Sequence, residues 1–274
     1  MKKILFLLTI FSATSLFAQT LTLGQAINMA GKQRMLSQRM AKDKIYKTMN
    51  KLTKEVDNEL ISSITLFDQN LKLLFAFAPT KEIKYKLEIV DLMWADYKKN
   101  LLERSRTATS YIFDRNTSML NSCDNVVKEL IAYSETLPKA TSTKAYDNTV
   151  LSTTISNSGK LRYLTQRLTL YYSSTYYKVN KDGTAEIKEA IDMFEKTLTS
   201  VNVSVLNNSD TEFKISEIYR VWNNLKSNMY KNDVIVIDRN QDSMDPVDVY
   251  QKANEILNNA DQLTNLYSML NMNS

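Results

Sequence analysis

Two arginines in a repeated motif are the residues of this sequence best suited to bind a small anion. Residues 27–40 read INMAGKQRMLSQRM and residues 155–168 read ISNSGKLRYLTQRL, so Arg34 and Arg162 each follow a glycine by three positions. A guanidinium group donates paired hydrogen bonds to planar oxygens, and two such groups without a carboxylate between them form a positive site that an anion fills. The motif therefore predicts oxyanion binding by arginine.

The spacing within the first motif indicates what each face of its helix contacts. At about 100° per residue, Met29, Leu36 and Met40 lie together and form an ordinary core stripe. The opposite side carries small residues beside the arginine, which lets the backbone of another helix come close. An arginine held there needs an acceptor, because a buried unpaired guanidinium costs several kcal/mol. The small-residue strip comprises Ala30, Gly31, Arg34, Ser37, Gln38 and Ala41 in the first motif and Ser158, Gly159, Arg162, Thr165 and Gln166 in the second.

Four further polar residues of the two motifs form a second tier of candidates: Gln38, Gln166, Arg39 and Arg167. The two glutamines share the face of the first arginine of each motif, where they either reach a ligand or bridge neighbouring helices. Arg39 and Arg167 lie about 140° around the helix from that arginine, which favours a solvated or salt-bridged role over ligand contact.

The composition excludes most catalytic and metal chemistry. The chain has no histidine, which removes Ser-His-Asp and Cys-His catalysis and the commonest metal ligand. The single cysteine, Cys123, forms neither an intramolecular disulfide nor a thiolate metal cluster, and is best interpreted as a small buried hydrophobe. The sequence therefore predicts a protein that is not an enzyme and has no catalytic residue, no metal site and no cofactor.

The first 18 residues are typical of a secretory signal peptide. Lys2 and Lys3 precede an apolar run that continues to about Phe11, and small residues lead to Ala18. Leu16 stands where a small residue is usual, so the export is predicted more firmly than the cleavage site. No later stretch approaches the roughly 18 apolar residues that span a bilayer. We therefore expect a periplasmic or secreted protein, a compartment in which nucleic acid is not a partner.

An internal repeat organises the chain. Seven of the fourteen motif positions are identical (Ile, Gly, Lys, Arg, Leu, Gln and Arg), where average residue usage gives roughly one. The offset is 128, and at the same offset the only two tryptophans, Trp94 and Trp222, lie opposite each other. We therefore predict two tandem copies of one unit, over residues 22–138 and 147–274.

Each copy has helical apolar spacing and few turn residues, since the chain has only four glycines and three prolines. The predicted fold class is therefore all-α, with each copy an up-and-down four-helix bundle. Asp182-Gly183 and Asp245-Pro246 mark breaks, and Ser209-Asp210 is typical of a helix N-terminus. The segments IFDRN (112–116) and VIVIDRN (234–240) are predicted to be short extended stretches. The predicted helices span residues 23–50, 53–77, 81–106, 117–137, 147–178, 184–206, 210–231 and 247–271.

The first motif, AGKQRMLSQRM, resembles a family signature. A Gly-x-x-Arg-Met-x-Ser-x-Arg pattern lies on the first helix of the extracytoplasmic sensing domain in nitrate/nitrite sensor histidine kinases and type IV pilus chemoreceptor-like transducers. The second motif keeps most of this pattern but has Tyr163 where methionine is usual. The matching positions are Gly31, Arg34, Met35, Ser37 and Arg39 in the first copy and Gly159, Arg162, Thr165 and Arg167 in the second.

The resemblance implies a ligand and a partner. In the nitrate sensors, equivalent first helices of two subunits meet, and the first arginine of each clasps one anion beside the motif glycine. Arg34 and Arg162 would then contact a small oxyanion, most simply nitrate or nitrite, with Gly31 and Gly159 allowing the approach. The site would form in a homodimer or in an intrachain pseudo-dimer. A membrane-bound histidine kinase or chemoreceptor would receive the signal.

The alternative to this hypothesis is a purely structural role for the two arginines. Arg34 and Arg162 would also be satisfied by carboxylates on neighbouring helices, in a ligand-free structural or adaptor protein of the cell envelope. The receptor hypothesis depends on both guanidinium groups lacking such counter-charges, and if both contacted acidic side chains the expectation would be only an exported helical scaffold.

Overall fold

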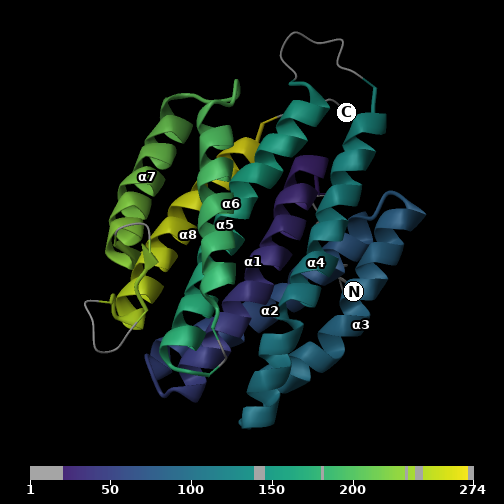
Figure 1. Cartoon of the computed structure of the whole chain (residues 1–274). Coiled ribbons are helices and arrows are strands. Elements are labelled where there is room, and N and C mark those ends of the chain that lie inside the picture. The colour runs from purple at the N-terminus through teal and green to yellow at the C-terminus, as the bar shows by residue number, and fades with distance from the viewer. Residues whose placement is uncertain (1–20, 139–145, 180–181, 232–233, 238–242, 271–274) are drawn as a thin grey trace, which may run out of the picture.

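The computed structural model describes residues 21–138, 146–179, 182–231, 234–237 and 243–270, and within these ranges the chain is almost entirely helical (Figure 1). The predicted all-α class is confirmed. A two-stranded antiparallel pair, β1 with β2, accompanies the helices. The elements are α1 (Leu23–Thr48), α2 (Thr53–Phe77), α3 (Lys81–Leu102), α4 (Arg106–Thr136), α5 (Asn148–Tyr176), α6 (Thr184–Asn202), α7 (Ser209–Met229), β1 (Tyr230–Lys231), β2 (Val234–Ile235) and α8 (Pro246–Ser268).

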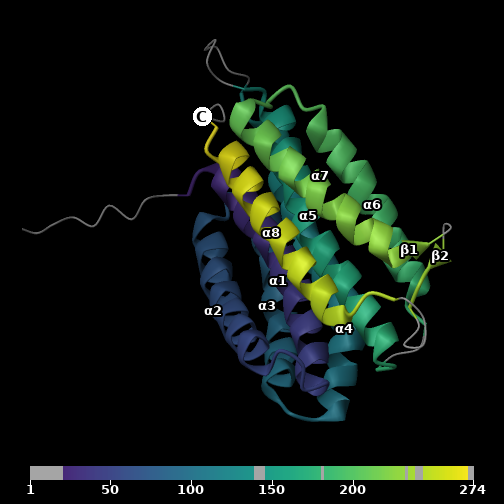
Figure 2. The same ribbon diagram turned by 90° about the vertical axis from the view of Figure 1, so that its left-hand side faces the viewer.

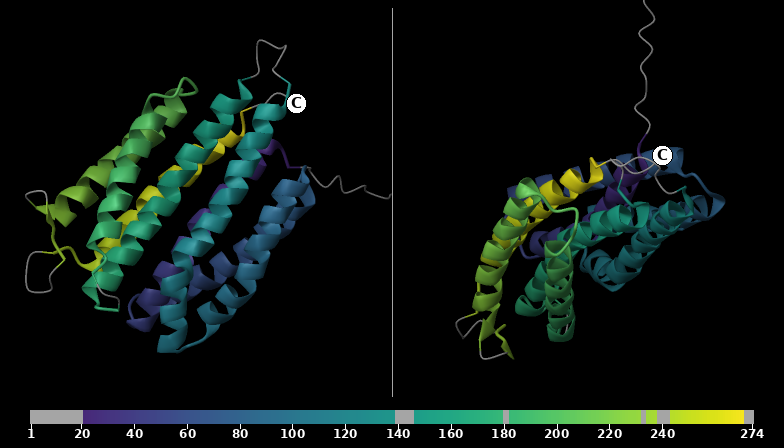
Figure 3. Two further views of the ribbon diagram at one scale, coloured as in Figure 1. Left: turned by 45° about the vertical axis from the view of Figure 1, so that its right-hand side comes forward. Right: turned by 90° about the horizontal axis from the view of Figure 1, so that it is seen from above.

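The two motif-bearing helices, α1 and α5, form the centre of the molecule and pack against each other. On one side α1 also contacts α2 and α4, and α3 packs on α4; on the other side α5 contacts α6 and α8, and α7 packs on α8. Figure 2 shows α1 and α8 side by side, with α2 and α7 toward the flanks. The helices of both sets run along one common direction (Figure 3). Each motif helix therefore contacts the other and two flanking helices of its own set.

Polar caps explain where several helices begin. The Thr22 side chain accepts a hydrogen bond from the Gln25 backbone N–H, and the Gln25 side-chain oxygen accepts one from the Thr22 backbone N–H, which closes a capping box at the start of α1. Asp245 caps α8, which begins at Pro246, one residue before the predicted start at residue 247. The predicted cap at Ser209 is wrong by one residue, because the Asn208 side chain accepts from the backbone of Asp210 and Thr211.

The predicted extended stretch at residues 112–116 is wrong, because α4 runs through this segment without a break. Ser105 supplies an N-cap by accepting from the Ala108 N–H, so the helix begins at Arg106. Ile112 and Met119 are then buried on one face seven residues apart, which is the helical repeat. The β-branched character of IFDRN therefore yields to packing of the whole helix.

The second predicted extended segment, residues 234–240, is extended where the structure describes it. Val234 and Ile235 form β2, and Ile235 pairs with Tyr230 of β1. Residues 238–240 lie outside the described residues.

The hydrophobic core is shared by both sets of helices, since one cluster of buried residues includes members from α1 to α8. Each set has the same aromatic pair within it. Phe67 stacks on Trp94 with ring centroids 4.1 Å apart, and Phe194 stacks on Trp222 at 4.0 Å. Each indole N–H donates to the carboxylate that follows the stacked phenylalanine. The two tryptophans are thus core anchors in matching surroundings.

Two sequence features bear on the relation to a membrane. The signal-peptide prediction for residues 1–18 falls outside the described residues. Among the residues that the structure does describe, no helix is both long enough and apolar enough to span a bilayer.

Candidate functional site

The motif arginines meet between the motif glycines. A Cβ atom on Gly31 would lie 2.9 Å from Arg162 Nη2 and 3.3 Å from Arg34 Nη2. A Cβ atom on Gly159 would lie 2.9 Å from Arg162 Nη2 and 3.4 Å from Arg34 Nη2. The two guanidinium ends therefore share the space that the missing side chains leave between α1 and α5. A single chain thus brings both arginines to one place.

Each arginine reaches across to the other motif helix in a reciprocal way. Arg34 Nη2 donates to the Ser156 carbonyl oxygen at 3.2 Å, and Arg162 Nη2 donates to the Asn28 carbonyl oxygen at 3.3 Å. Residues 28 and 156 are separated by 128 positions, as are the two arginines. The two carbonyl contacts therefore occupy equivalent places in the repeat.

The expectation that the guanidinium groups lack counter-charges is wrong. Arg34 Nη1 lies 2.8 Å from Asp124 Oδ1 on α4, and Arg162 Nη1 lies 2.6 Å from Asp261 Oδ1 on α8. The reason is the packing order, in which α4 and α8 each run beside a motif helix and turn one aspartate toward it. Arg162 also donates to the side-chain oxygen of Asn28 at 2.8 Å.

Each of these aspartates also contacts a lysine. Lys128 Nζ lies 2.9 Å from Asp124 Oδ2, and Lys32 Nζ lies 3.4 Å from Asp261 Oδ2. A carboxylate that contacts both a lysine and an arginine neutralises only one of them. The contacts around the arginine pair therefore hold more positive than negative charge.

Burial is the largest cause of the pKa shifts at this contact, and neighbouring positive charge adds to it. Burial lowers the pKa of Arg162; Asp261 opposes this shift, whereas Arg34 adds to it. Burial likewise lowers the pKa of Lys160, and repulsion by Arg34 adds to the effect. Burial acts to raise the pKa of Asp124, but the Arg34 charge and Lys128 together hold it below its ordinary value. An added anion would therefore enter a field that favours it.

Both arginines keep unused donors. Arg34 is 1% exposed and Arg162 is fully buried, and the Nε atom of each has no hydrogen-bond partner among the described residues. A buried donor without a partner costs about 1–3 kcal/mol, and more when it is charged. Each guanidinium group thus retains one N–H donor that the described residues do not use.

Gln38 and Arg167 of the second tier lie in a network one helical turn beyond Arg34. Arg167 Nη1 donates to Gln38 Oε1 at 3.4 Å and to Asn116 Oδ1 at 3.3 Å. Gln38 Nε2 donates to the Asn116 carbonyl oxygen at 3.1 Å. These contacts join α1, α5 and α4, so both residues bridge helices.

Gln166 and Arg39 lie in a corresponding network toward α8 and α2. Gln166 Nε2 donates to Asn254 Oδ1 at 3.3 Å, and Asn254 Nδ2 donates to Glu59 Oε2 at 3.2 Å. Arg39 Nε is 3.6 Å from Glu59 Oε1. Glu59 therefore links this tier to α2, and the second-tier residues lie beyond the arginine pair without contacting it.

A buried acid beside this network was not predicted. Lys42 and Asp43 are both fully buried on α1, and Lys42 Nζ lies 3.4 Å from Asp43 Oδ1 and 2.6 Å from Glu59 Oε1. Burial raises the pKa of Glu59, but Lys42 and Arg39 outweigh it and lower the value to about 2. Burial raises the pKa of Asp43 well above its ordinary value; Lys42 opposes this shift, and the neighbouring Glu59 charge adds to it. The buried Asp43 carboxyl group therefore favours its neutral form, and neither of its oxygens has a hydrogen-bond partner among the described residues.

Replacement of this acid has an expected pH dependence. Because the folded-state pKa of Asp43 exceeds the unfolded one, its stability contribution is present at low pH and is lost as pH rises through the folded-state value. The side-chain amide of the Asp43→Asn variant copies the protonated acid and does not titrate, so the melting temperature of this variant relative to wild type should increase from pH 4 to pH 8. Thermal unfolding across this range measures the difference. Asp91→Asn, which removes an exposed carboxylate of α3, is the control and should show no such trend.

The residues that sequence reasoning missed are the acceptors. Asp124 and Asp261 are separated from their arginines by 90 and 99 positions, and no repeat or motif marks them. Asn28 lies inside the first motif, but its counterpart is Ser156, so the comparison of the two motifs passed over it. The available signal was its place one turn before the glycine.

Comparison with known families supplies a context for this geometry. Residues 16–112 match the PilJ family model, described as the type IV pili methyl-accepting chemotaxis transducer N-terminal domain. Over that segment the chain is similar to this sensory domain. The match covers α1 to α3 and the first turns of α4, and it includes Gly31 and Arg34. No curated protein and no solved structure matches the chain.

Proposed function

We propose that the protein is an extracytoplasmic sensor in which Arg34 and Arg162 together bind one small oxyanion, nitrate or nitrite. The observation that carries the proposal is the convergence of both guanidinium groups on Gly31 and Gly159 at the α1–α5 contact. The PilJ match supports a sensory role of the chemoreceptor type. Two copies of one unit, residues 22–138 and 147–274, would then form an intrachain pseudo-dimer with the site between them.

The two aspartates determine how an anion would come to bind the arginines. The side chains of Asp124 and Asp261 are 24% and 33% exposed, and each keeps a lysine contact on its other oxygen. An arginine that turns to an anion would therefore leave its aspartate paired with Lys128 or Lys32. The anion competes with Asp124 and Asp261 for the same donors, and its binding exchanges one set of ion pairs for another.

This exchange supplies a signal. While the arginines contact the aspartates, Arg34 links α1 to α4 and Arg162 links α5 to α8. With the arginines on one shared anion, α1 and α5 would be tied more strongly to each other. A ligand that favours one packing shifts the population toward it. We propose that a separate membrane-bound transducer, a histidine kinase or a chemoreceptor, reads this shift.

Calorimetric titration of the full chain with nitrate, nitrite, chloride and sulfate tests the proposal. We expect selective binding of nitrate or nitrite, at one anion per chain, by a protein whose mass in solution is that of a monomer. One anion per two chains would contradict the intrachain site. Absence of selective binding would contradict the sensor proposal and leave the ligand-free structural or adaptor protein, for which the arginine–aspartate pairs are sufficient.

Removal of one competing carboxylate should strengthen anion binding. In Asp124→Asn the Arg34 guanidinium loses its charged partner, so nitrate affinity should rise about tenfold, equivalent to roughly 1.4 kcal/mol. The stability of the unliganded protein should fall, because a buried ion pair is lost. Calorimetry and thermal unfolding measure the two effects.

The rise in nitrate affinity together with the fall in stability distinguishes a binding site from a purely structural ion pair. A purely structural arginine–aspartate pair would give the loss of stability without any gain in affinity. Asp91→Asn removes an exposed carboxylate from α3 and should change neither quantity.

A further inference from the structure

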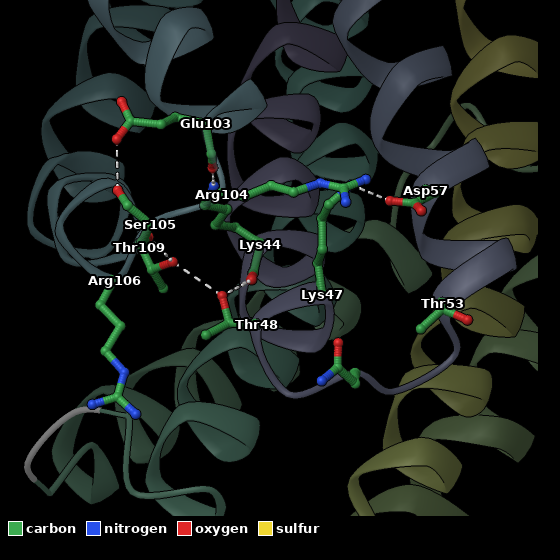
Figure 4. Close-up of a pocket in the computed structure, with 11 residues that line it drawn as sticks. Lys44, Lys47, Thr48, Thr53, Asp57, Glu103, Arg104, Ser105, Arg106 and Thr109 are labelled. Atoms are coloured by element: carbon green, nitrogen blue, oxygen red, sulfur yellow. Dashed lines mark hydrogen bonds and ion pairs between the residues drawn. The ribbon is translucent and has the colours of Figure 1, made fainter.

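A polar cavity lies at the end of the molecule where α1 ends and where α2 and α4 begin (Figure 4). Its volume is about 400 Å³, within the range of small-molecule sites. Lys44 on its wall is ten residues beyond Arg34, which places the cavity about 15 Å along α1 from the motif arginines. The cavity is therefore separate from the site described above.

The lining carries more basic than acidic side chains. Its charged residues are Lys44, Lys47, Arg104, Arg106, Asp57 and Glu103. Asp57 is committed to an ion pair with Lys47, and the Glu103 carboxylate accepts from the Ser105 hydroxyl. The two acids are thus already occupied, while the basic groups outnumber them.

The two arginines of the cavity are free to bind a ligand. Arg104 and Arg106 are exposed, and within the described residues neither guanidinium has a hydrogen-bond or ion-pair partner. Figure 4 shows Arg104 extending across the cavity toward Lys47 and Asp57. A guanidinium group without a protein partner can bind a planar carboxylate through paired hydrogen bonds.

The helix ends add to the positive field. Thr53 begins α2, which has no side-chain cap, and Arg106 begins α4; both line the cavity. The N-terminal end of a helix carries partial positive charge and unpaired N–H groups. The carbonyl end of α3 is also present, but the buried Lys44 amine donates to the Leu101 and Glu103 carbonyl oxygens. The negative end of α3 is therefore neutralised.

A neighbouring cavity extends the site. Its volume is about 460 Å³, and it shares Thr48, Arg106 and Thr109 with the first. It adds one basic and one acidic residue, Lys178 and Asp114. Burial lowers the pKa of Lys44, and repulsion by Lys47 adds to this. Lys44 and Lys47 therefore repel each other, and a bound anion would relieve this repulsion.

We propose that this cavity binds a small organic anion with more than one carboxylate, held by the guanidinium groups of Arg104 and Arg106. We expect more than one carboxylate on the ligand because several basic groups line the same cavity. The polar character follows from the lining of the first cavity, which contains no aromatic or aliphatic side chain. The site would serve a second ligand, distinct from the oxyanion at the motif arginines.

Calorimetric titration of the full chain with citrate, acetate and inorganic phosphate at constant ionic strength tests this inference. We expect one citrate per chain, and at least about tenfold weaker binding of acetate and of phosphate, because neither offers several carboxylates to the guanidinium groups. The double variant R104Q/R106Q should bind citrate at least about tenfold more weakly than wild type. Both arginines are exposed, so the variant should keep the wild-type melting temperature.

The control is Arg115→Gln, which removes a guanidinium from an exposed position of α4 outside both cavities. It should leave citrate binding unchanged. The proposal is overturned by absence of saturable citrate binding, by equal affinity in the double variant, or by phosphate binding more tightly than citrate. Displacement of citrate by stoichiometric nitrate would show that the two anions share the motif site and would also overturn it.

Discussion

Replacement of Arg34 or of Arg162 by glutamine should abolish the rise in melting temperature that nitrate gives to the wild-type protein. Each variant removes one of the two forks that converge on Gly31 and Gly159, and one fork cannot enclose the anion from both sides. A ligand that binds only the folded state stabilises it by mass action, so loss of binding removes the whole shift. Thermal unfolding with and without nitrate measures it.

The same substitutions should also lower the stability of the unliganded protein. Breaking a buried ion pair costs about 3–5 kcal/mol, and we expect the lower end because Lys128 and Lys32 remain on the orphaned aspartates. Arg34→Lys keeps the charge without the fork, and should recover part of this stability without recovering the nitrate shift.

An exposed arginine provides the control for this pair of substitutions. Arg220→Gln removes a side chain that contacts Glu217 and Glu255 on the surface, and it should change neither nitrate binding nor stability by a measurable amount. If the Arg34→Gln and Arg162→Gln proteins fold and bind nitrate as tightly as wild type does, the proposal of a shared site is contradicted. Loss in only one variant would indicate a single active motif.

The largest stability effect is expected from the two tryptophans. Trp94→Ala and Trp222→Ala should each destabilise the protein by about 3–5 kcal/mol, since each removes a buried ring stacked on a phenylalanine. The two losses should be similar, because the surroundings match. Urea unfolding followed by far-ultraviolet circular dichroism measures both.

The shape of the unfolding curve carries separate information. One buried cluster joins both sets of helices, so each variant should unfold in a single transition that is shifted as a whole. Two transitions, with only the one from the substituted set displaced, would mean that the sets unfold independently and that the shared core contributes little to cooperativity.

Local signals predicted much of the fold. The apolar spacing and breaks such as Asp245-Pro246 predicted helices close to those observed, because caps and periodicity act over a few residues. The error at residues 112–116 arose from weighing local β-branched character above the burial of Ile112 and Met119. That burial depends on packing between helices, which the local pattern does not contain.

Part of the candidate site was likewise predictable from the sequence, and part was not. The glycine and arginine of each motif appear in a repeat of fourteen residues, and the small-residue strip predicted that another helix would pack there; that helix is α5. The acceptors Asp124 and Asp261 come from distant helices with no signature of their own. Their approach follows from the order in which α4 and α8 pack, and only the three-dimensional arrangement reveals it.

The meeting of Arg34 and Arg162 within one polypeptide has a consequence for how the proposed sensor would respond. A receptor assembled from two identical molecules loses its ligand affinity on dilution, since its partners drift apart before they encounter the stimulus. Here the covalent connection fixes the pairing, so the response would depend on the concentration of the stimulus and would be independent of how many copies of the protein its compartment holds.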